Sequence, residues 1–182
     1  MPTIYLVRHG RAAAGWDVDP DPGLDDLGHE QARRMAERLA SKGPLALLCS
    51  PMLRTRETAA PLAATWELTP TIEPRVSEIP SPTTDLAERG RWLRTVAADR
   101  WPNMDQALLR WRSDILAALT EIERDTVVVT HFMVINAAAG AAIDDERVVH
   151  FRPDYCSVTV LSNDGGRLRL LEQGAEAETR VL

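Results

Sequence analysis

The chain has 182 residues, 45% of them hydrophobic, which suits one domain with a sizeable core. Its 27 acidic and 21 basic residues give a net charge of −6 without any basic block, which disfavours binding to nucleic acid. No apolar run approaches the span of a bilayer and the N-terminus lacks a basic n-region, so we expect a cytoplasmic protein that does not bind membranes. Cys49 and Cys156 lie far apart in apolar sequence, which predicts buried thiols rather than a disulfide or a zinc pair.

The first half of the chain alternates short apolar runs with helical patterns. Residues 3–7 predict a buried strand, and residues 26–40 repeat apolar side chains at helical spacing with Asp25 as the expected N-cap. A second apolar run at 45–49 predicts another strand, followed by a second helix. Pro61 must lie in the first turn of that helix or at a kink, because proline cannot donate the interior hydrogen bond.

The middle of the chain is expected to form a cap or lid of about residues 80–104. A third strand is predicted at 69–72, and residues 83–103 then resemble an inserted helix rich in arginine. The candidate substrate contacts in this cap are Trp92, Trp101, Arg89, Arg91 and Arg94. The alternative is that the tryptophans pack in the core and the arginines face water, as such side chains on helices commonly do.

The last part of the chain predicts a helix, a strand, a further helix and a hairpin. The amphipathic helix covers 104–123 with Asn103 as its expected N-cap, and the β-branched run 126–130 leads into a helix over 133–142. Two terminal strands, at 158–161 and 168–171, are joined by a turn sequence. These elements predict an α/β fold, a three-layer sandwich with a mostly parallel central sheet flanked by helices and a small helical cap insertion.

Polar side chains follow three of the predicted strands. Arg8-His9-Gly10 follows the first, Ser50 through Arg54 follows the second, and His131 ends the β-branched run. Each motif alone has an ordinary structural explanation, such as a satisfied histidine at a strand end or a surface arginine. Because ligands of open α/β sheets bind outside the carboxyl ends of the strands, we expect the three motifs to converge on one site.

Two guanidinium groups and two imidazoles in one place predict phosphoryl chemistry. Arginine matches the doubly charged oxygens of a phosphoryl group, and a neutral imidazole is a competent nucleophile toward phosphorus. We interpret His9 as the nucleophile, with Arg8, Arg54 and His131 stabilising the charge that spreads over the transferred group. That arrangement can replace a metal.

The motifs resemble those of the histidine phosphatase superfamily, also called the phosphoglycerate-mutase-like family. The resemblance spans nearly the whole chain, so that residues 1–182 are expected to form a single domain of this kind. The matching stretches are Leu6 to Gly10, Leu24 to Ala32, Ser50 to Ala59, Val127 to His131 and Tyr155 to Leu161.

The resemblance implies a role for each matching residue. It makes His9 the phosphorylated nucleophile, with Arg8, Arg54 and His131 around the phosphate. It makes Glu78 the proton donor to the leaving oxygen, although Glu73 is close enough in sequence to compete for that role. Ser50 and Thr58 are candidates for contacts around Arg54, and helix capping explains them equally well.

Within the family, we expect a short phosphatase rather than a mutase. The chain lacks the longer insert of the mutases that it resembles, and Arg11-Ala12 stands where those mutases usually carry an acidic residue. The expected reaction is therefore metal-independent hydrolysis of a phosphomonoester through a phosphohistidine, on a small phosphorylated molecule or a phosphoprotein.

Three alternatives stay open. They are phosphoryl transfer of the phosphoglycerate-mutase type, a module that binds phosphate or another anion without catalysis, and a metal-dependent hydrolase using His9 and His131. No metal-ligand spacing supports the last, so no metal or cofactor is expected.

Overall fold

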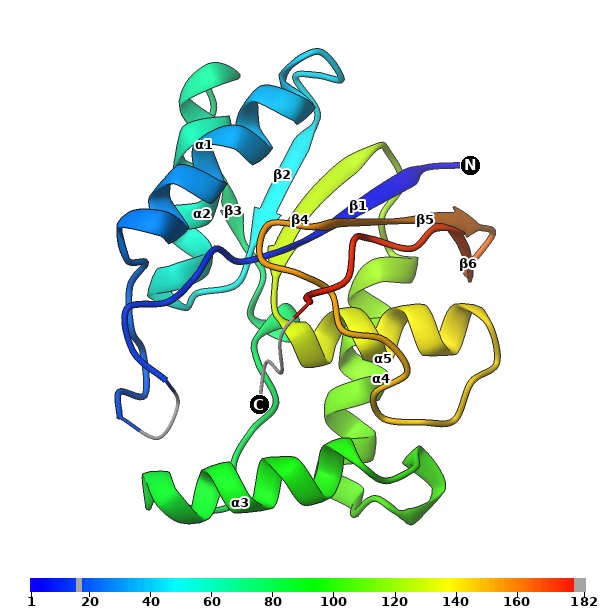
Figure 1. Ribbon diagram of the computed structural model, residues 1–182. Helices are drawn as coiled ribbons and strands as arrows, with labels where there is room; N and C mark the ends of the chain where they lie inside the picture. Colours follow the sequence, from blue (N-terminus) through cyan, green and yellow to red (C-terminus); the bar gives the residue numbers. More distant parts are fainter. Residues whose placement is uncertain (16–17, 179–182) are drawn as a thin grey trace.

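The computed structural model describes residues 1–15 and 18–178, and these contain a six-stranded mixed sheet (Figure 1). The strand order is β3-β2-β4-β1-β5-β6. Strands β1, β2, β3 and β4 pair in parallel, whereas β5 pairs antiparallel with both β1 and β6. Their bounds are β1 (Thr3–Arg8), β2 (Ala46–Cys49), β3 (Thr71–Ile72), β4 (Thr126–Thr130), β5 (Val158–Asp164) and β6 (Arg167–Glu172).

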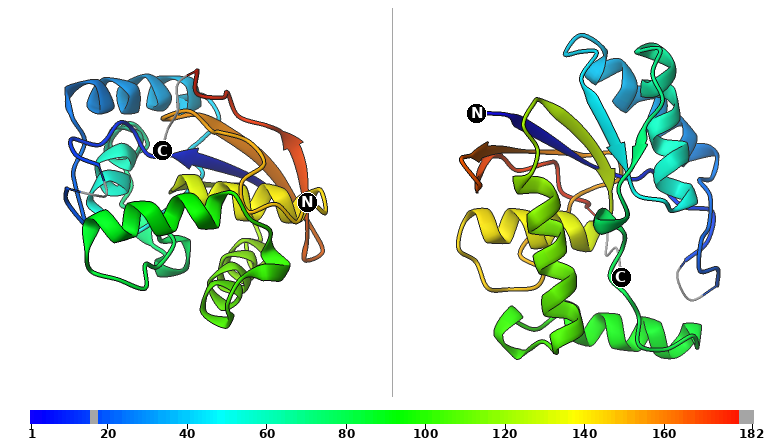
Figure 2. Two further views of the ribbon diagram at one scale, coloured as in Figure 1. Left: turned by 60° about the horizontal axis from the view of Figure 1, so that its bottom comes forward. Right: turned by 180° about the vertical axis from the view of Figure 1, so that it is seen from behind.

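Helices cover the sheet on both faces, as Figures 1 and 2 show. On one face α1 (Asp26–Ala40) and α2 (Leu53–Thr65) enclose an apolar cluster with Val7, Val127 and Val129. On the other face α4 (Gln106–Thr120) and α5 (Phe132–Ala142) enclose a larger cluster with Leu6 and Val128. Successive side chains of β1 and β4 point to opposite faces of the sheet, so each of these strands contributes to both apolar clusters. The predicted three-layer α/β class is confirmed.

The register of the parallel strands brings their carboxyl ends to one edge. Arg8 is paired with Thr130, and Cys49 with Val129. The chain leaves each strand at the same level, because the backbone amide of His9 donates to the Thr130 carbonyl at 3.0 Å and that of Ser50 donates to the Val129 carbonyl at 3.2 Å. The residues that follow β1, β2 and β4 consequently start from neighbouring points.

Of the two positions that the sequence allows for Pro61, the first turn of the helix is excluded. It is the ninth residue of α2, well beyond the first turn, and the helix continues to Thr65. An interior proline costs roughly 3 kcal/mol because a hydrogen bond is lost. The buried side chains of Ala59, Leu62 and Ala63, which pack into the core below α1, offset that cost.

The cap segment is more broken than the sequence predicts. Instead of one helix over 83–103, α3 (Leu86–Ala97) ends early and a short 3₁₀ turn, η2 (Trp101–Asn103), follows. The chain turns there because the Trp101 amide donates to the Glu146 carbonyl at 2.8 Å. Figures 1 and 2 show α3 lying beyond α4, away from the sheet.

The N-cap predicted for α4 is also wrong. Asp105, not Asn103, caps the helix, and its carboxylate accepts from the Leu108 amide at 2.9 Å. Asn103 is used within the preceding turn, where its side-chain amide donates to Asp99 at 2.7 Å. Asp105 caps the Leu108 amide, so the helix begins at Gln106, two residues later than predicted.

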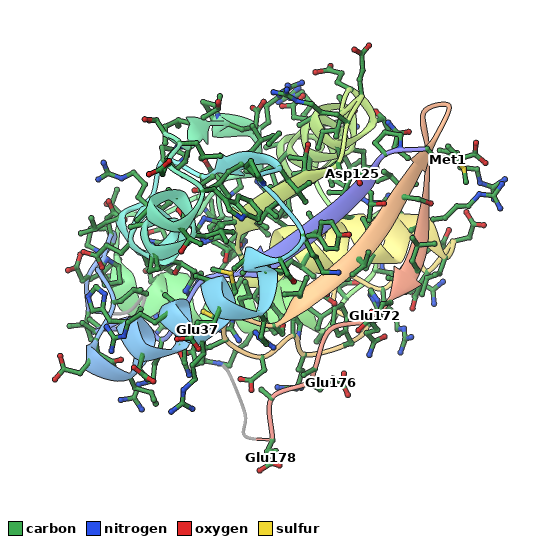
Figure 3. The ribbon with its side chains drawn as sticks, turned by 90° about the horizontal axis from the view of Figure 1, so that it is seen from above. Met1, Glu37, Asp125, Glu172, Glu176 and Glu178 are labelled. Atoms are coloured by element: carbon green, nitrogen blue, oxygen red, sulfur yellow. The ribbon has the colours of Figure 1, made fainter. Side chains whose placement is uncertain are left out.

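Beyond β6 the chain continues as an extended segment along the outside of the molecule. Figure 3 shows Glu172, Glu176 and Glu178 following one another along this path. The segment is attached by backbone hydrogen bonds from Asp154 to Ala175 and from Ala177 to Arg152.

Both cysteines are buried free thiols, as predicted. Among the described residues, no helix has the length and apolar character needed to cross a bilayer.

Candidate active site

His9 stands at the end of β1 with its ring tautomer fixed by two hydrogen bonds. Its Nδ1 lies 2.7 Å from the Gly10 carbonyl oxygen, and its Nε2 lies 3.3 Å from Nε of Arg54. A carbonyl can only accept and a guanidinium can only donate, so Nδ1 carries the proton and Nε2 carries the lone pair. Burial, with the charges of Arg8 and Arg54, holds the pKa of His9 well below its ordinary value. Nε2 of His9 is therefore unprotonated at neutral pH.

The loop after His9 is held in place by a close backbone approach and a buried hydroxyl. A Cβ on Gly10 would lie 2.6 Å from the Gly28 carbonyl oxygen at the start of α1, which only glycine permits. The Gly10 amide donates to Oγ1 of Thr58 at 2.9 Å, and this hydroxyl donates to the Arg54 carbonyl at 2.7 Å. Thr58 thus ties the loop that carries His9 to the helix that carries Arg54.

Arg54 bridges the two histidines from the first turn of α2. Its side chain is 1% exposed, and Nη2 lies 3.3 Å from Nδ1 of His131. Since the guanidinium donates, Nδ1 of His131 accepts, and Nε2 of His131 then donates to Oγ of Ser50 at 2.8 Å. Burial is the main reason that the pKa of His131 lies well below its ordinary value, with Arg54 as the next cause.

Arg8 is held between two aromatic rings. Its guanidinium carbon lies 4.0 Å from the ring centroid of Tyr155 and 5.3 Å from that of Phe132. Nη1 donates to the Pro153 carbonyl at 2.8 Å, whereas the buried Nε has no hydrogen-bond partner among the described residues. Stacking and one carbonyl fix the charge in place and leave donors for an anion.

Of the two carboxylates that compete as proton donor, the structure brings only Glu78 to the site. Its side chain is 4% exposed, and Oε2 lies 3.8 Å from Nδ1 of His131. Burial raises the pKa of Glu78, with Arg54 acting in the opposite direction. The Glu73 carboxylate instead accepts two hydrogen bonds from the Arg75 guanidinium, at 2.9 and 2.8 Å, outside the cavity.

These side chains line a cavity of about 600 Å³. Arg8, His9, Arg54 and Glu78 are among the charged and titratable residues that line it. His131, which is fully buried, begins α5, whose positive N-terminal dipole favours an anion there. Among the described residues, no group of three or more His, Cys, Asp or Glu side chains is placed to hold a metal ion.

The cap contributes to this cavity through α3 but not through its tryptophans. Arg91 and Arg94 line the cavity and are exposed to solvent. Trp101 is 2% exposed in the core, with its ring centroid 6.3 Å from that of Trp111, and Trp92 packs against the same core. The tryptophans therefore follow the core alternative.

The match to a known family covers almost the entire chain. Residues 4–175 match the family described as "Histidine phosphatase superfamily (branch 1)". The chain belongs to the histidine phosphatase superfamily. Its motifs and its fold thus agree with the resemblance found in the sequence.

Curated relatives match about two fifths of the chain. A PE-PGRS family protein of Mycobacterium tuberculosis is 43% identical over 82 residues, which are 42% of this chain and 14% of that protein. A probable phosphoglycerate mutase, GpmB, of Yersinia pestis is 34% identical over 83 residues, 43% of this chain and 39% of the relative. The matched stretch is therefore well under half the length of either relative.

Solved structures share the fold over nearly the full chain. YhfR of Bacillus stearothermophilus has a TM-score of 0.78 at 21% identity, over 97% of this chain and 98% of its own. A mycobacterial glucosyl-3-phosphoglycerate phosphatase has a TM-score of 0.72 at 21% identity, over 97% and 100%. A putative alpha-ribazole-5'-P phosphatase of Escherichia coli has a TM-score of 0.74 at 20% identity, over 97% of both chains.

Sequence reasoning assigned no role to the two rings that hold Arg8. Tyr155 comes just before β5, which runs antiparallel to β1, so its position at the same edge as His9 follows from the topology. The backbone amide of Cys156 donates to the Arg8 carbonyl at 2.9 Å and completes this junction. An aromatic residue just before a strand that pairs antiparallel with the strand ending at His9 is the signal that would have found Tyr155.

Proposed function

We propose that this histidine phosphatase hydrolyses phosphomonoesters through a phosphohistidine at Nε2 of His9, without a metal ion. One observation carries the proposal. The lone-pair nitrogen of His9 lies 3.3 Å from Nε of Arg54 inside a buried site that also holds Arg8 and Glu78. A nucleophile, fixed positive charge and a carboxylic acid are the groups that phosphoryl transfer from an ester requires.

In the first step Nε2 of His9 attacks phosphorus and the bond to the leaving oxygen breaks. Arg8 and Arg54 donate to the non-bridging oxygens, where negative charge accumulates. Glu78 gives its proton to the leaving oxygen, and burial, which raises the pKa of this carboxyl, favours the protonated form that the step needs. Because Nδ1 keeps its proton, the phosphorylated ring is cationic, and the Gly10 carbonyl 2.7 Å away stabilises that charge.

In the second step water attacks the phosphohistidine. The Glu78 carboxylate accepts a proton from the water, the new bond forms between oxygen and phosphorus, and the bond from phosphorus to Nε2 breaks. His9 regains its lone pair and Glu78 regains its proton. Ester and water have become alcohol and inorganic phosphate, and the protein has returned to its starting state.

The test is hydrolysis of p-nitrophenyl phosphate by the purified protein in the presence of EDTA. We expect turnover that the chelator does not abolish and that His9→Ala removes, while a circular dichroism spectrum like that of the wild type shows the variant folded. His29→Ala is the matched control, because His29 is a half-exposed histidine on α1, outside the cavity. The proposal would be overturned if His9→Ala kept most of the wild-type turnover. It would also be overturned if EDTA abolished turnover by the wild-type protein.

Experiments on the same purified protein distinguish hydrolysis from mutase-type phosphoryl transfer and from anion binding without catalysis. A mutase would convert 3-phosphoglycerate to 2-phosphoglycerate without releasing phosphate, which ³¹P NMR distinguishes from hydrolysis. A binding module would bind inorganic phosphate in calorimetry but would not label His9 from any phosphomonoester.

A further inference from the structure

The turn that places Tyr155 on Arg8 contains a residue in an unfavourable backbone conformation. Residues 154–157 form this turn, because the Ser157 amide donates to the Asp154 carbonyl at 3.1 Å. Cys156, its third residue, has a φ of 54°, in the left-handed region that residues other than glycine seldom adopt. A strained conformation of this kind persists only where the surrounding contacts hold it.

Both peptide groups of Cys156 are held by hydrogen bonds. Its amide donates to the Arg8 carbonyl at 2.9 Å, at the end of β1. Its carbonyl accepts from Nη2 of Arg38 at 2.8 Å, and Arg38 lies in the last turn of α1. A charged donor makes a stronger hydrogen bond than a neutral one. Arg38 therefore connects α1 to the 154–157 turn.

The Arg38 guanidinium has no other polar contact in the described parts of the chain. Within residues 1–15 and 18–178 its one hydrogen bond is to Cys156, and it makes no salt bridge. Two arginines earlier on α1 differ, since Arg33 and Arg34 pair with Glu30 at 2.6 and 2.9 Å. A cation in the last turn also opposes the helix dipole, so a test must separate that effect from the contact with the turn.

The segment 153–157 holds Arg8 from three sides. The Tyr155 ring centroid lies 4.0 Å from the guanidinium carbon, and Nη1 donates to the Pro153 carbonyl at 2.8 Å. The Arg8 amide donates to the Ser157 carbonyl at 3.2 Å. Arg8 lines the cavity together with His9, so a shift of this segment moves the guanidinium relative to the nucleophile.

We propose that Arg38 is a positioning residue for phosphoryl transfer, whose hydrogen bond to Cys156 keeps the 154–157 turn strained and Tyr155 stacked on Arg8. Arg38 is not among the residues that line the cavity of the nucleophile, so it acts through the turn alone. The inference rests on the proposed function, because it concerns the geometry of that same reaction.

The first experiment follows Arg38→Ala with two measurements. With p-nitrophenyl phosphate we expect kcat/KM to fall about tenfold, as when a charge-assisted hydrogen bond that fixes a reacting geometry is lost. The ring current of Tyr155 shields the protons of the Arg8 guanidinium, so the Arg8 Nε–H resonance in NMR reports the stacking; its absence from Arg8→Lys identifies it. We expect this resonance to move downfield in Arg38→Ala.

A double-mutant cycle tests the strained link itself. Glycine adopts a positive φ freely, so in a Cys156→Gly background the turn no longer depends on Arg38. We expect Arg38→Ala to lower kcat/KM about twofold or less there, against about tenfold beside Cys156. The cycle compares like with like, because any loss caused by removing the buried thiol is present in both members of the glycine pair.

Arg34→Ala is the matched control. Arg34 is an exposed arginine on the same helix that pairs with Glu30, so its loss changes the net charge equally and should leave kcat/KM and the Arg8 resonance as in the wild type. The inference would be overturned by a wild-type Arg8 resonance in Arg38→Ala, or by equal effects of Arg38→Ala in the two backgrounds. Absence of hydrolysis by the wild-type protein would count against the proposed function, while the Arg8 resonance would still test the positioning.

Discussion

Thr58→Val tests the link between the nucleophile loop and α2. The substitution keeps the shape of the side chain and removes the hydroxyl that accepts from the buried Gly10 amide at 2.9 Å. A buried donor left without a partner costs about 1–3 kcal/mol. The Arg54 carbonyl, which also receives this hydroxyl, keeps the backbone bond that its helical position supplies, so its loss adds little. We therefore expect Thr58→Val to destabilise the fold by about 2 kcal/mol.

That loss is measurable in two ways. For a chain of this length, about 2 kcal/mol lowers Tm by roughly 4–8 °C and reduces the urea midpoint at unchanged m. Because the Gly10 carbonyl orients His9, we also expect kcat to fall, by up to about 100-fold for a displacement near 1 Å. Thr58→Ser, which retains the hydroxyl, should recover most of both properties. Wild-type Tm and kcat in Thr58→Val would refute the reasoning.

Three further predictions concern the acid, the pH profile and the cap helix. Glu78→Gln should reduce kcat/KM most for esters with poor leaving groups, and an equal loss for p-nitrophenyl and alkyl phosphates would count against the acid role. The pKa of His9 is lowered and that of Glu78 is raised, so kcat/KM should fall in acid as His9 is protonated and in base as Glu78 ionises. Glu78→Gln should remove the fall in base. A fall in base that persists in this variant would contradict the assignment of Glu78. Gly90→Ala should stabilise the protein by about 0.4–1 kcal/mol in urea denaturation, because alanine is favoured over glycine in a helix and the added methyl meets no atom closer than 3.7 Å. A lower urea midpoint would mean that the space beside Gly90 is too small for a methyl group.

The convergence of the main motifs was predictable from strand order and direction. His9, Ser50 and His131 each follow a strand that the sequence marks by its apolar run, and parallel neighbours end at one edge of the sheet. The β-branched run at 126–130 is fully buried between two layers of helices, which explains why its pattern was clear.

The family resemblance favoured Glu78 over Glu73, but the residues alone did not separate them, because both lie in the irregular segment after β3. What separates them is Arg75, whose guanidinium binds Glu73 and keeps it outside the cavity. Local sequence carries no sign of this, since an ion pair two residues apart depends on how the chain turns.

The interior position of Pro61 and the wrong cap at Asn103 have a common origin. Rules based on local sequence consider only one lost hydrogen bond or one possible cap. The observed helix boundaries also depend on the tertiary packing of α2 and on the 3₁₀ turn that ends at Asn103. The role of α3 in the cavity is a similar case. Arg91 and Arg94 line the cavity, while Leu93 and Val96 of the same helix are buried.

Three hydrogen bonds that hold Arg8 come from residues 153–157, so they can form only after most of the chain has been synthesised. The backbone amide of Arg8 donates to Ser157, its backbone carbonyl accepts from Cys156, and its guanidinium donates to Pro153. A ribosome-bound chain exposing only the first 150 residues would already contain His9, Arg54 and His131, but of the groups that hold Arg8 it would contain only the Phe132 ring. Ester cleavage should therefore switch on late in translation, which makes turnover by stalled nascent chains a readout of when the last β-strands dock.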